Sequence, residues 1–139
     1  MNVYLSDMLY DAIVAYSTEA LPAEACGIIV GVNHGDHLQA SKFFPLSNLA
    51  GDPAREFTIN PLELLPYLQN DKQPVIGLFH SHPSAAAIPS ERDLQTLWHT
   101  IPSYWILSLL KPSQPELAVY QLKKTITTTY HKLPLVRGQ

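Results

Sequence analysis

The chain is organised around VIGLFHSHP, the stretch from Val75 to Pro83. Its first five residues are nearly all apolar, which predicts a central strand that is buried on both faces of a sheet. This strand would deliver His80 and His82 to its C-terminal end. Because side chains alternate along a strand, two histidines separated by one residue point in roughly the same direction.

Ser90 and Asp93 follow after a loop that contains Pro83 and Pro89, so that two imidazoles and a carboxylate lie within fourteen residues. A catalytic zinc site keeps three protein ligands and leaves its fourth position to water or substrate. A lone HxH pair is weak evidence for a metal, whereas the pattern HxHP-x6-SxxD is much more specific. Ser81, between the histidines, should face away from such a site, and it is given no catalytic role.

The same residues also have a purely structural interpretation. Ser90 and Asp93 precede Leu94, Leu97 and Trp98, a pattern typical of a helix that begins with a capping box. The two histidines would then be ordinary residues of the loop between strand and helix. Each structural role is the simpler hypothesis when it is taken alone. The combination of all four polar positions favours the metal site.

Composition bounds the class of protein. With 139 residues, the sequence suits one domain, residues 1–139, whose hydrophobic core is large enough to be stable without disulfides or a structural metal. Hydrophobic residues make up 46% and charged residues 15%, which predicts a globular chain rather than a disordered one. A net charge of −3 argues against a surface built for nucleic acid and against an electrostatic membrane anchor.

Cys26 is the only cysteine, so no internal disulfide can form, and the composition suits a reducing compartment. We expect a buried, inert thiol, because free cysteine commonly behaves as a small hydrophobe. The first residues lack a basic segment followed by an apolar run, so a signal peptide is not expected. No apolar stretch approaches the roughly 20 residues that span a bilayer. We therefore expect a cytoplasmic protein without a membrane partner.

Hydrophobic periodicity and turn residues predict a mixture of helices and strands. An apolar stripe from Leu5 to Tyr16 predicts an amphipathic helix with Ser6 as its N-cap. A second helix should begin at Pro61 and be short or kinked, because Pro66 lies inside it. Mixed strands and three helices indicate an α+β fold, or an α/β fold with a mixed, curved sheet flanked by helices. The remaining expected elements are strands at residues 25–32, 37–46, 56–59, 104–110, 116–122 and 124–130, and a loose tail at residues 131–139.

Glu24 is the carboxylate in the most suggestive setting outside the histidine stretch. It lies at the mouth of the first apolar strand, within PAEACG, residues 22–27. A zinc-bound water needs a general base that is not itself a ligand, and carboxylates are costly to bury unless they are paired or put to use. Taken alone, Glu24 is more often a surface charge at a strand edge, so both interpretations stay open.

Glu24 within EACG, together with HSHP-x6-SxxD, resembles the JAMM (MPN-plus) family of zinc metallopeptidases. The segment from Ser47-Asn48 through EFTINP, residues 56–61, is also similar to the small free-standing prokaryotic branch, where an F-x-I-x-P stretch precedes the second helix. The resemblance covers roughly residues 5–122, and every polar position of its motif is filled. It implies a JAMM/MPN-like fold with an architecture similar to that of cytidine deaminases.

The resemblance also implies the chemistry of the site. His80, His82 and Asp93 would bind one zinc ion per chain, with water as the fourth ligand. Glu24 would take a proton from that water and pass it to the leaving amine, and Ser90 would donate a hydrogen bond to the developing oxyanion. The expected function is hydrolysis of a peptide or isopeptide bond after the C-terminal Gly-Gly of a ubiquitin-like or sulfur-carrier protein.

Other functions are compatible with parts of this pattern. A non-catalytic MPN-type interaction module would have lost metal ligands, and all of them are present here. A DNA-repair-associated relative shares an HxHPS-x5-SxxD pattern, but the acidic balance of the chain disfavours nucleic acid. A zinc nucleoside deaminase needs two cysteines close together, and this chain has one. The expected partner is the extended C-terminal tail of the carrier protein, and a homodimer is compatible with the sequence.

Overall fold

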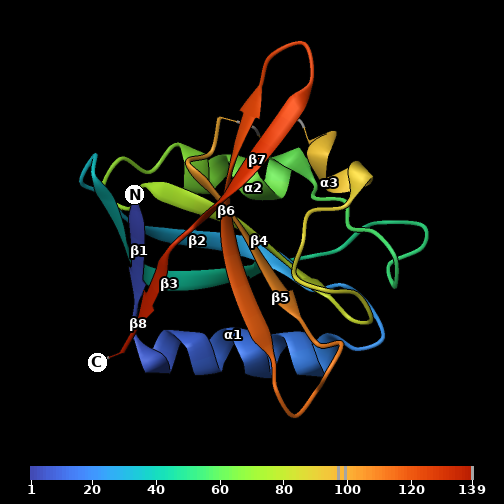
Figure 1. Cartoon of the computed structure of the whole chain (residues 1–139). Helices are drawn as coiled ribbons and strands as arrows, with labels where there is room; N and C mark the ends of the chain where they lie inside the picture. The colour runs from blue at the N-terminus through green and yellow to red at the C-terminus, as the bar shows by residue number, and fades with distance from the viewer. Residues whose placement is uncertain (97, 99, 139) are drawn as a thin grey trace.

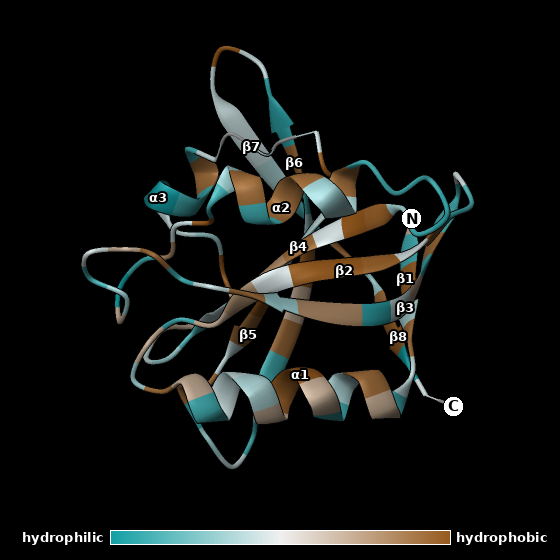
Figure 2. Ribbon diagram, turned by 180° about the vertical axis from the view of Figure 1, so that it is seen from behind, coloured by the Kyte–Doolittle hydropathy of each residue, from teal (hydrophilic) through white to brown (hydrophobic). Residues whose placement is uncertain are grey.

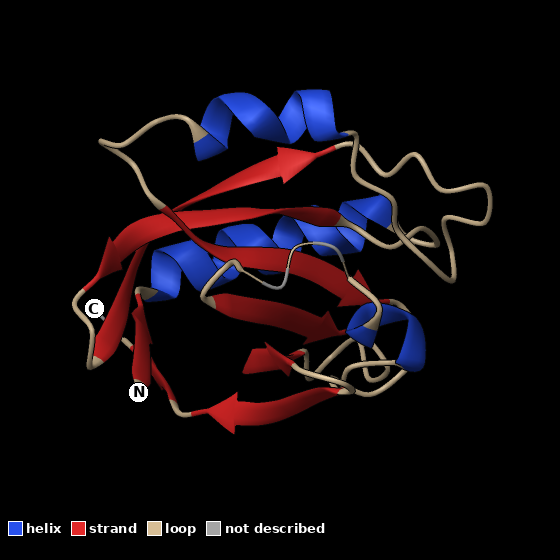
Figure 3. Ribbon diagram, turned by 90° about the horizontal axis from the view of Figure 1, so that it is seen from above, coloured by secondary structure: helices blue, strands red, loops and turns tan. Residues whose placement is uncertain are grey.

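The computed structural model describes residues 1–96, 98 and 100–138. Within these residues, eight strands form one mixed sheet and three helices pack around it (Figure 1). The helices are α1 (Asp7–Ala20), α2 (Pro61–Leu68) and α3 (Glu91–Leu94). The strands are β1 (Asn2–Leu5), β2 (Cys26–Asn33), β3 (His37–Leu46), β4 (Val75–His82), β5 (Ser103–Ser108), β6 (Glu116–Lys124), β7 (Thr128–Leu133) and β8 (Leu135–Arg137). The expected α+β fold with a mixed, curved sheet is confirmed (Figure 3).

The strand that carries the two histidines lies near the middle of the sheet. The strand order is β7-β6-β5-β4-β2-β3-β1-β8, and β4 pairs antiparallel with β2 and parallel with β5. Every residue of β4 after Val75 is buried, as expected for a strand that is covered on both faces. Since the strand extends through His82, its hydrogen bonds hold the backbone of both histidines.

Helices cover both faces of the sheet, α1 on one face and α2 on the other (Figures 1 and 2). On the α1 face, Phe79 belongs to the same apolar cluster as Ile13. On the α2 face, Leu78 belongs to the same cluster as Leu64. Because side chains alternate along β4, the two histidines share the face of Leu78, and the serine between them shares the face of Phe79.

The predicted helix starts agree with the structure. The Ser6 side chain caps α1 by accepting a hydrogen bond from the Leu9 N–H at 3.1 Å, and the helix continues beyond the predicted Tyr16. Asn60 caps α2 in the same way through the Leu62 N–H at 3.0 Å. As expected for a helix with an internal proline, α2 is only eight residues long.

The prediction of a loose tail is wrong. Residues 131–133 belong to β7, and residues 135–137 form β8, which pairs parallel with β1 at the other end of the chain. Such short strands are stabilised by their neighbours in the sheet, so local periodicity does not reveal them. The strand expected at residues 124–130 begins instead at Thr128, because β6 runs on to Lys124.

Residues 56–59, expected as a strand, form part of an irregular loop. Their backbone groups bond to the preceding part of that loop. The Leu49 N–H donates to the Thr58 carbonyl at 2.9 Å, and the Thr58 N–H donates to the Asn48 side chain at 3.1 Å. This loop is therefore folded on itself instead of joining the sheet.

The helix predicted after Ser90 is shorter than expected. It ends at Leu94 instead of continuing to Trp98, and Leu97 lies outside the described residues. Over the part of the chain that the structure describes, no helix is both long enough and apolar enough to cross a membrane.

Candidate active site

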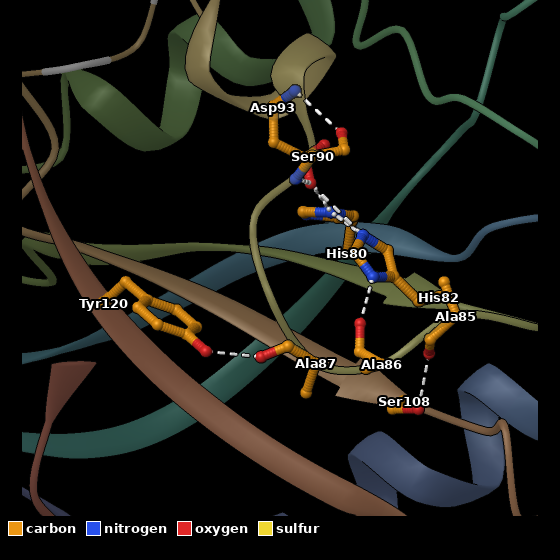
Figure 4. Close-up of polar contacts among 9 residues, drawn as sticks. All are labelled: His80, His82, Ala85, Ala86, Ala87, Ser90, Asp93, Ser108 and Tyr120. Carbon is orange, nitrogen blue, oxygen red and sulfur yellow. Dashed lines mark hydrogen bonds and ion pairs between the residues drawn. The ribbon is translucent and has the colours of Figure 1, made fainter. Parts of the chain in front are cut away.

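Three side chains from two separate elements converge at the C-terminal end of β4 (Figure 4). The Nε2 atoms of His80 and His82 lie 3.0 Å apart. The Oδ2 atom of Asp93 lies 3.1 Å from the first nitrogen and 3.2 Å from the second. All three side chains are nearly buried, with exposed fractions of 1%, 8% and 10%. The fold thus brings together the residues that the sequence predicts as metal ligands.

The spacing of these donor atoms fits a small cation. Two ligands at 2.0–2.1 Å from a tetrahedral zinc ion are separated by roughly 3.3 Å. The separations here, 3.0–3.2 Å, are close to that value. Imidazole nitrogen and carboxylate oxygen are both zinc ligands, and three of them leave a fourth position open. The residues therefore suit zinc by donor type as well as by spacing.

The loop after β4 orients His82. Its Nδ1 donates a hydrogen bond to the Ala86 carbonyl at 2.7 Å, which leaves Nε2 with a lone pair directed toward the other two ligands. The carbonyls before and after that of Ala86 accept hydrogen bonds from the hydroxyls of Ser108 and Tyr120 (Figure 4). Three consecutive carbonyls thus tie this loop to β4, β5 and β6.

The irregular loop of residues 47–60 shields His80. The ring of Phe57 stacks on the imidazole, with centroids 4.5 Å apart and planes inclined by 21°. Next to it, Glu56 forms an ion pair with Arg92 and so joins the loop to α3. Phe57 therefore covers one face of the His80 imidazole.

A capping box holds Asp93, so that the structural and the metal interpretations describe one arrangement. The Asp93 N–H donates to Ser90 Oγ at 3.1 Å, and the Ser90 N–H donates to Asp93 Oδ2 at 2.9 Å. This Oδ2 is the atom that faces the two histidines. The cap therefore orients the carboxylate toward the candidate metal position.

Burial and mutual contacts set the charges of the three side chains. Burial lowers the pKa of His80, which favours a neutral imidazole. Burial also opposes charge on the other two, but it is outweighed there by hydrogen bonds. Hydrogen bonds from the two histidines hold the pKa of Asp93 well below its usual range. Hydrogen bonds to Asp93 and to the Ala86 carbonyl raise the pKa of His82. An ionised carboxylate beside a neutral imidazole is what metal ligation requires.

Glu24 lies two residues before the start of β2, on the same side as the ligands. The strand register pairs Cys26 with His80, and extending it by two residues sets Glu24 opposite His82. Glu24 is 7% exposed, so it is not a surface charge. It lines a cavity of about 220 Å³ together with His82 and Ser90. The structure thus places the predicted base, one predicted ligand and the predicted oxyanion donor around a common space.

Stability of the metal-free protein is expected to decrease as the pH rises through about 7. Burial raises the pKa of Glu24 from 4.5 to about 7, and the nearby His82 only partly offsets this effect. The folded state therefore keeps a proton that the unfolded chain has already released. Glu24 contributes stability that is complete below the unfolded pKa and is lost as the pH passes the folded pKa, by at most about 1.4 kcal/mol per pH unit.

Urea unfolding at pH 5–8 would measure this effect in metal-free wild type and in Glu24→Gln. The difference between the two proteins isolates Glu24 from other titrating groups. We expect the wild type to lose stability more steeply with rising pH than the variant does. Parallel curves for the two proteins would contradict the assignment of a buried, proton-binding Glu24.

A larger cavity of about 460 Å³ also borders the candidate ligands. Its walls include His80 and Asp93 together with the aromatic side chains of Phe57, Trp98 and Tyr104. The aromatic rings come from the irregular loop, the segment after α3 and β5. Sequence reasoning did not assign these side chains to the site, because no local pattern joins residues so far apart.

Cys26 behaves as the sequence predicts. Its thiol is buried, and burial raises its pKa to about 12, so that the sulfur stays protonated. The prediction for Ser81 holds only in part. Its side chain does leave the ligand face, but it is fully buried and accepts a hydrogen bond from the Ala25 N–H at 2.8 Å. Sequence periodicity places the hydroxyl on that face without revealing its partner.

The family to which the chain belongs follows from a comparison with known protein families. The family described as prokaryotic homologs of the JAB domain matches residues 6–123. The chain belongs to this family, which places it among the small prokaryotic relatives of JAMM and MPN proteins. The resemblance seen in its motif is thereby confirmed.

Over the segments that align, individual relatives are identical to this chain at about a quarter to a third of the positions. Tail tip assembly protein K of Escherichia phage N15 is 31% identical over 83 residues, which are 60% of this chain and 31% of that protein. Desampylase of Haloferax volcanii is 29% identical over 90 residues, 60% of this chain and 63% of that protein. CysO-cysteine peptidase of Mycobacterium tuberculosis is 27% identical over 116 residues, 82% of this chain and 78% of that protein. The chain thus spans less than two thirds of the length of the first two.

A solved structure supports the fold. The solution structure of protein DSY2949 from Desulfitobacterium hafniense superposes with a TM-score of 0.81 at 29% identity. The match covers 99% of this chain and 94% of that one. The sheet and helices described above are therefore those of a known fold.

Proposed function

We propose that this chain is a zinc-dependent peptidase or isopeptidase of the JAMM type. The observation that carries the proposal is the cluster of His80, His82 and Asp93 beside a buried Glu24. A carboxylate with a pKa near neutrality next to metal ligands is where a general base is expected. A relative named as a peptidase supports the reaction class. Glu24, the two histidines of β4 and Asp93 of α3 meet on one continuous sheet, which supports a single domain over residues 1–139.

The two histidines would bind the ion through Nε2 and Asp93 would bind it through Oδ2. When bound, zinc supplies Lewis-acid polarisation of the scissile carbonyl and lowers the pKa of a coordinated water to about 7. Because Asp93 is ionised and His80 is neutral, these two side chains need no change of protonation on binding.

Glu24 would carry the proton during the reaction. Its carboxylate takes a proton from the attacking water as the new C–O bond forms. It then gives that proton to the amine nitrogen as the C–N bond breaks, and so returns to its ionised form. A pKa of about 7 suits both halves of this transfer, because the group can accept and release a proton near neutral pH.

Ser90 would stabilise the negative charge that develops on the carbonyl oxygen. Its Oγ accepts a hydrogen bond from the Asp93 N–H, which fixes the position of the oxygen. The hydroxyl can then donate its own proton into the cavity that it shares with Glu24. Removing one such donor from a well-studied protease costs about 10²–10³-fold in turnover.

The substrate that we propose is a ubiquitin-like or sulfur-carrier protein extended beyond a C-terminal Gly-Gly. One relative is named as a CysO-cysteine peptidase and another, from Thermus thermophilus, as a protease that cleaves TtuB-protein conjugates, which supports a protein conjugate as the substrate. An extended tail can be recognised by strand addition, which needs backbone hydrogen bonds and small pockets. The bond cleaved would be the one after the second glycine.

A mass-spectrometric cleavage assay tests this function. Small ubiquitin-like sulfur carriers extended beyond Gly-Gly are incubated with zinc-loaded wild type, with chelator-treated wild type and with Ser90→Ala. We expect a cut directly after the diglycine in the wild type and no cut after metal removal. Ser90→Ala should turn over about 10²–10³-fold more slowly.

Ser113→Ala is the matched control, because Ser113 is an exposed serine in the turn between β5 and β6. It should cleave like the wild type. Cleavage that persists after complete removal of metal would contradict a zinc peptidase. A zinc-replete protein that leaves every diglycine extension intact would overturn the proposed substrate class.

A further inference from the structure

The backbone of Glu24 is held from two sides by side chains that take no part in the mechanism above. One of them is Ser81, which lies between the two candidate ligand histidines on β4. The other is Asn48, which lies at the start of the irregular loop of residues 47–60. Together they bond the two polar atoms of one peptide group, the one that joins Glu24 to Ala25.

Ser81 joins Glu24 to the histidine strand through the next residue, Ala25. The Ser81 N–H donates to the Ala25 carbonyl at 2.9 Å, and the Ala25 N–H donates to Ser81 Oγ at 2.8 Å. The serine therefore holds Ala25 by its backbone and by its side chain at once. Since Ser81 is fully buried, water cannot replace its hydroxyl as an acceptor. These two bonds tie the ligand strand to the residue that follows Glu24.

Asn48 joins the carbonyl of Glu24 to the loop. Its Nδ2 donates to the Glu24 carbonyl and to the Glu56 carbonyl, each at 3.0 Å. Its Oδ1 accepts hydrogen bonds from the N–H groups of Ala50 and Thr58 at 3.0 and 3.1 Å. One amide side chain thus organises the loop and fastens Glu24 to it.

The loop also binds the N–H of Glu24, which donates to the Pro53 carbonyl at 2.6 Å. Both polar backbone groups of Glu24 are therefore engaged by the loop, and the following N–H is engaged by Ser81. These contacts fix the position of the Glu24 Cα atom, from which the side chain extends. The position of a catalytic group matters for the rate, because a misplacement of about 1 Å can cost roughly 10²-fold.

We propose that Ser81 and Asn48 are positioning residues that set the place of the Glu24 carboxylate relative to His80, His82 and Asp93. The proposal rests on the proposed function for its catalytic consequence, but not for the placement of Glu24 itself. It assigns a role to two residues that touch neither the ligand atoms nor the carboxylate. If either hydrogen bond is removed, the carboxylate should move toward solvent.

The test measures the placement of Glu24 without metal or substrate. The carboxyl carbons of glutamate are labelled with ¹³C, and the pKa of Glu24 is determined by NMR in metal-free protein. The Glu24 signal is assigned by its absence in Glu24→Gln. We expect a pKa of about 7 in the wild type. In Ser81→Ala and in Asn48→Ala it should fall toward 4.5, since a displaced carboxylate is better solvated.

A second readout is turnover of the zinc-loaded variants on the diglycine substrate. Loss of a residue that orients a site group typically costs about 10–100-fold, and we expect this loss in kcat with KM and zinc content unchanged. Ser81→Thr keeps the hydroxyl and should restore both the pKa of Glu24 and kcat.

Matched controls separate positioning from general stability. Ser103→Ala removes a buried serine hydroxyl from β5, where it bonds the Ile76 carbonyl and the Trp105 indole N–H. Asn70→Ala removes an asparagine side chain that accepts from the Lys72 N–H in an exposed turn. Both controls should keep the pKa of Glu24 and kcat at their wild-type values.

The outcomes distinguish this proposal from the proposed function. An unchanged pKa of Glu24 in both Ser81→Ala and Asn48→Ala would overturn the positioning role. If Ser81→Ala does not fold, Asn48→Ala decides by itself, because Asn48 lies in a loop outside the core. A wild type that cleaves no substrate would refute the proposed function, and the NMR titration would still decide where Glu24 is held.

Discussion

Replacing Glu24 by glutamine is expected to lower turnover by about 10²–10⁴-fold, the range typical for loss of a general acid–base group. The amide has nearly the same shape as the carboxylate, but it cannot take a proton from water or deliver one to the leaving amine. Because Glu24 is buried beside His82, a carboxylate on the protein surface cannot take its place. Zinc affinity should change little, since Glu24 is not among the three clustered ligands.

Steady-state kinetics on the diglycine substrate, together with metal analysis, would measure this effect. Glu19→Gln makes the same chemical change on the exposed side of α1 and should behave like the wild type. A Glu24→Gln protein that binds one zinc ion and keeps full activity would exclude Glu24 as the proton carrier. A variant that loses zinc along with activity would instead place Glu24 among the ligands.

Replacing Asp93 by asparagine is expected to weaken zinc binding by more than about 100-fold. Loss of an outer partner of a metal ligand costs 10–100-fold, and loss of a charged ligand should exceed that range. The substitution keeps the size of the side chain and its place in the turn. It removes the negative charge that faces both Nε2 atoms at 3.1 and 3.2 Å.

Competition with a chromophoric chelator would give the zinc affinity, and thermal unfolding would give an independent readout. A ligand present at 100 times its Kd stabilises the folded state by about 2.7 kcal/mol. Zinc should therefore raise the Tm of the wild type and leave that of Asp93→Asn unchanged. Asp71→Asn, in an exposed turn, is the control and should respond like the wild type. An equal rise of Tm in Asp93→Asn would show that Asp93 is not a ligand.

Much of the sheet could be predicted from local patterns in the sequence. The apolar run from Val75 to Phe79 is a buried central strand because a strand covered on both faces excludes polar side chains. Ser6 and Asn60 cap their helices as expected, because capping depends on residues within one turn. The predictions failed where partners are remote, as in β1 and β8, or where a loop satisfies its own backbone, as at residues 56–59.

In the candidate site, too, local rules determined some features and the tertiary structure decided others. The sequence by itself determined the residue types of the ligand set and the shared direction of His80 and His82, because strand alternation is a local rule. It also determined the capping box that orients Asp93. For Glu24, the local pattern by itself favoured a surface charge at the edge of a strand over a buried carboxylate.

Only the tertiary structure decided that Glu24 is buried opposite His82, that Phe57 covers His80 and that Ser81 holds the residue after Glu24. Each of these facts depends on the antiparallel register of β2 on β4 or on the course of the loop between β3 and α2. Register and loop course are set by contacts between residues far apart in the chain. Local periodicity determines on which face of its own strand a side chain lies. Which side chain of the neighbouring strand it contacts is determined only by the register in which the two strands pair.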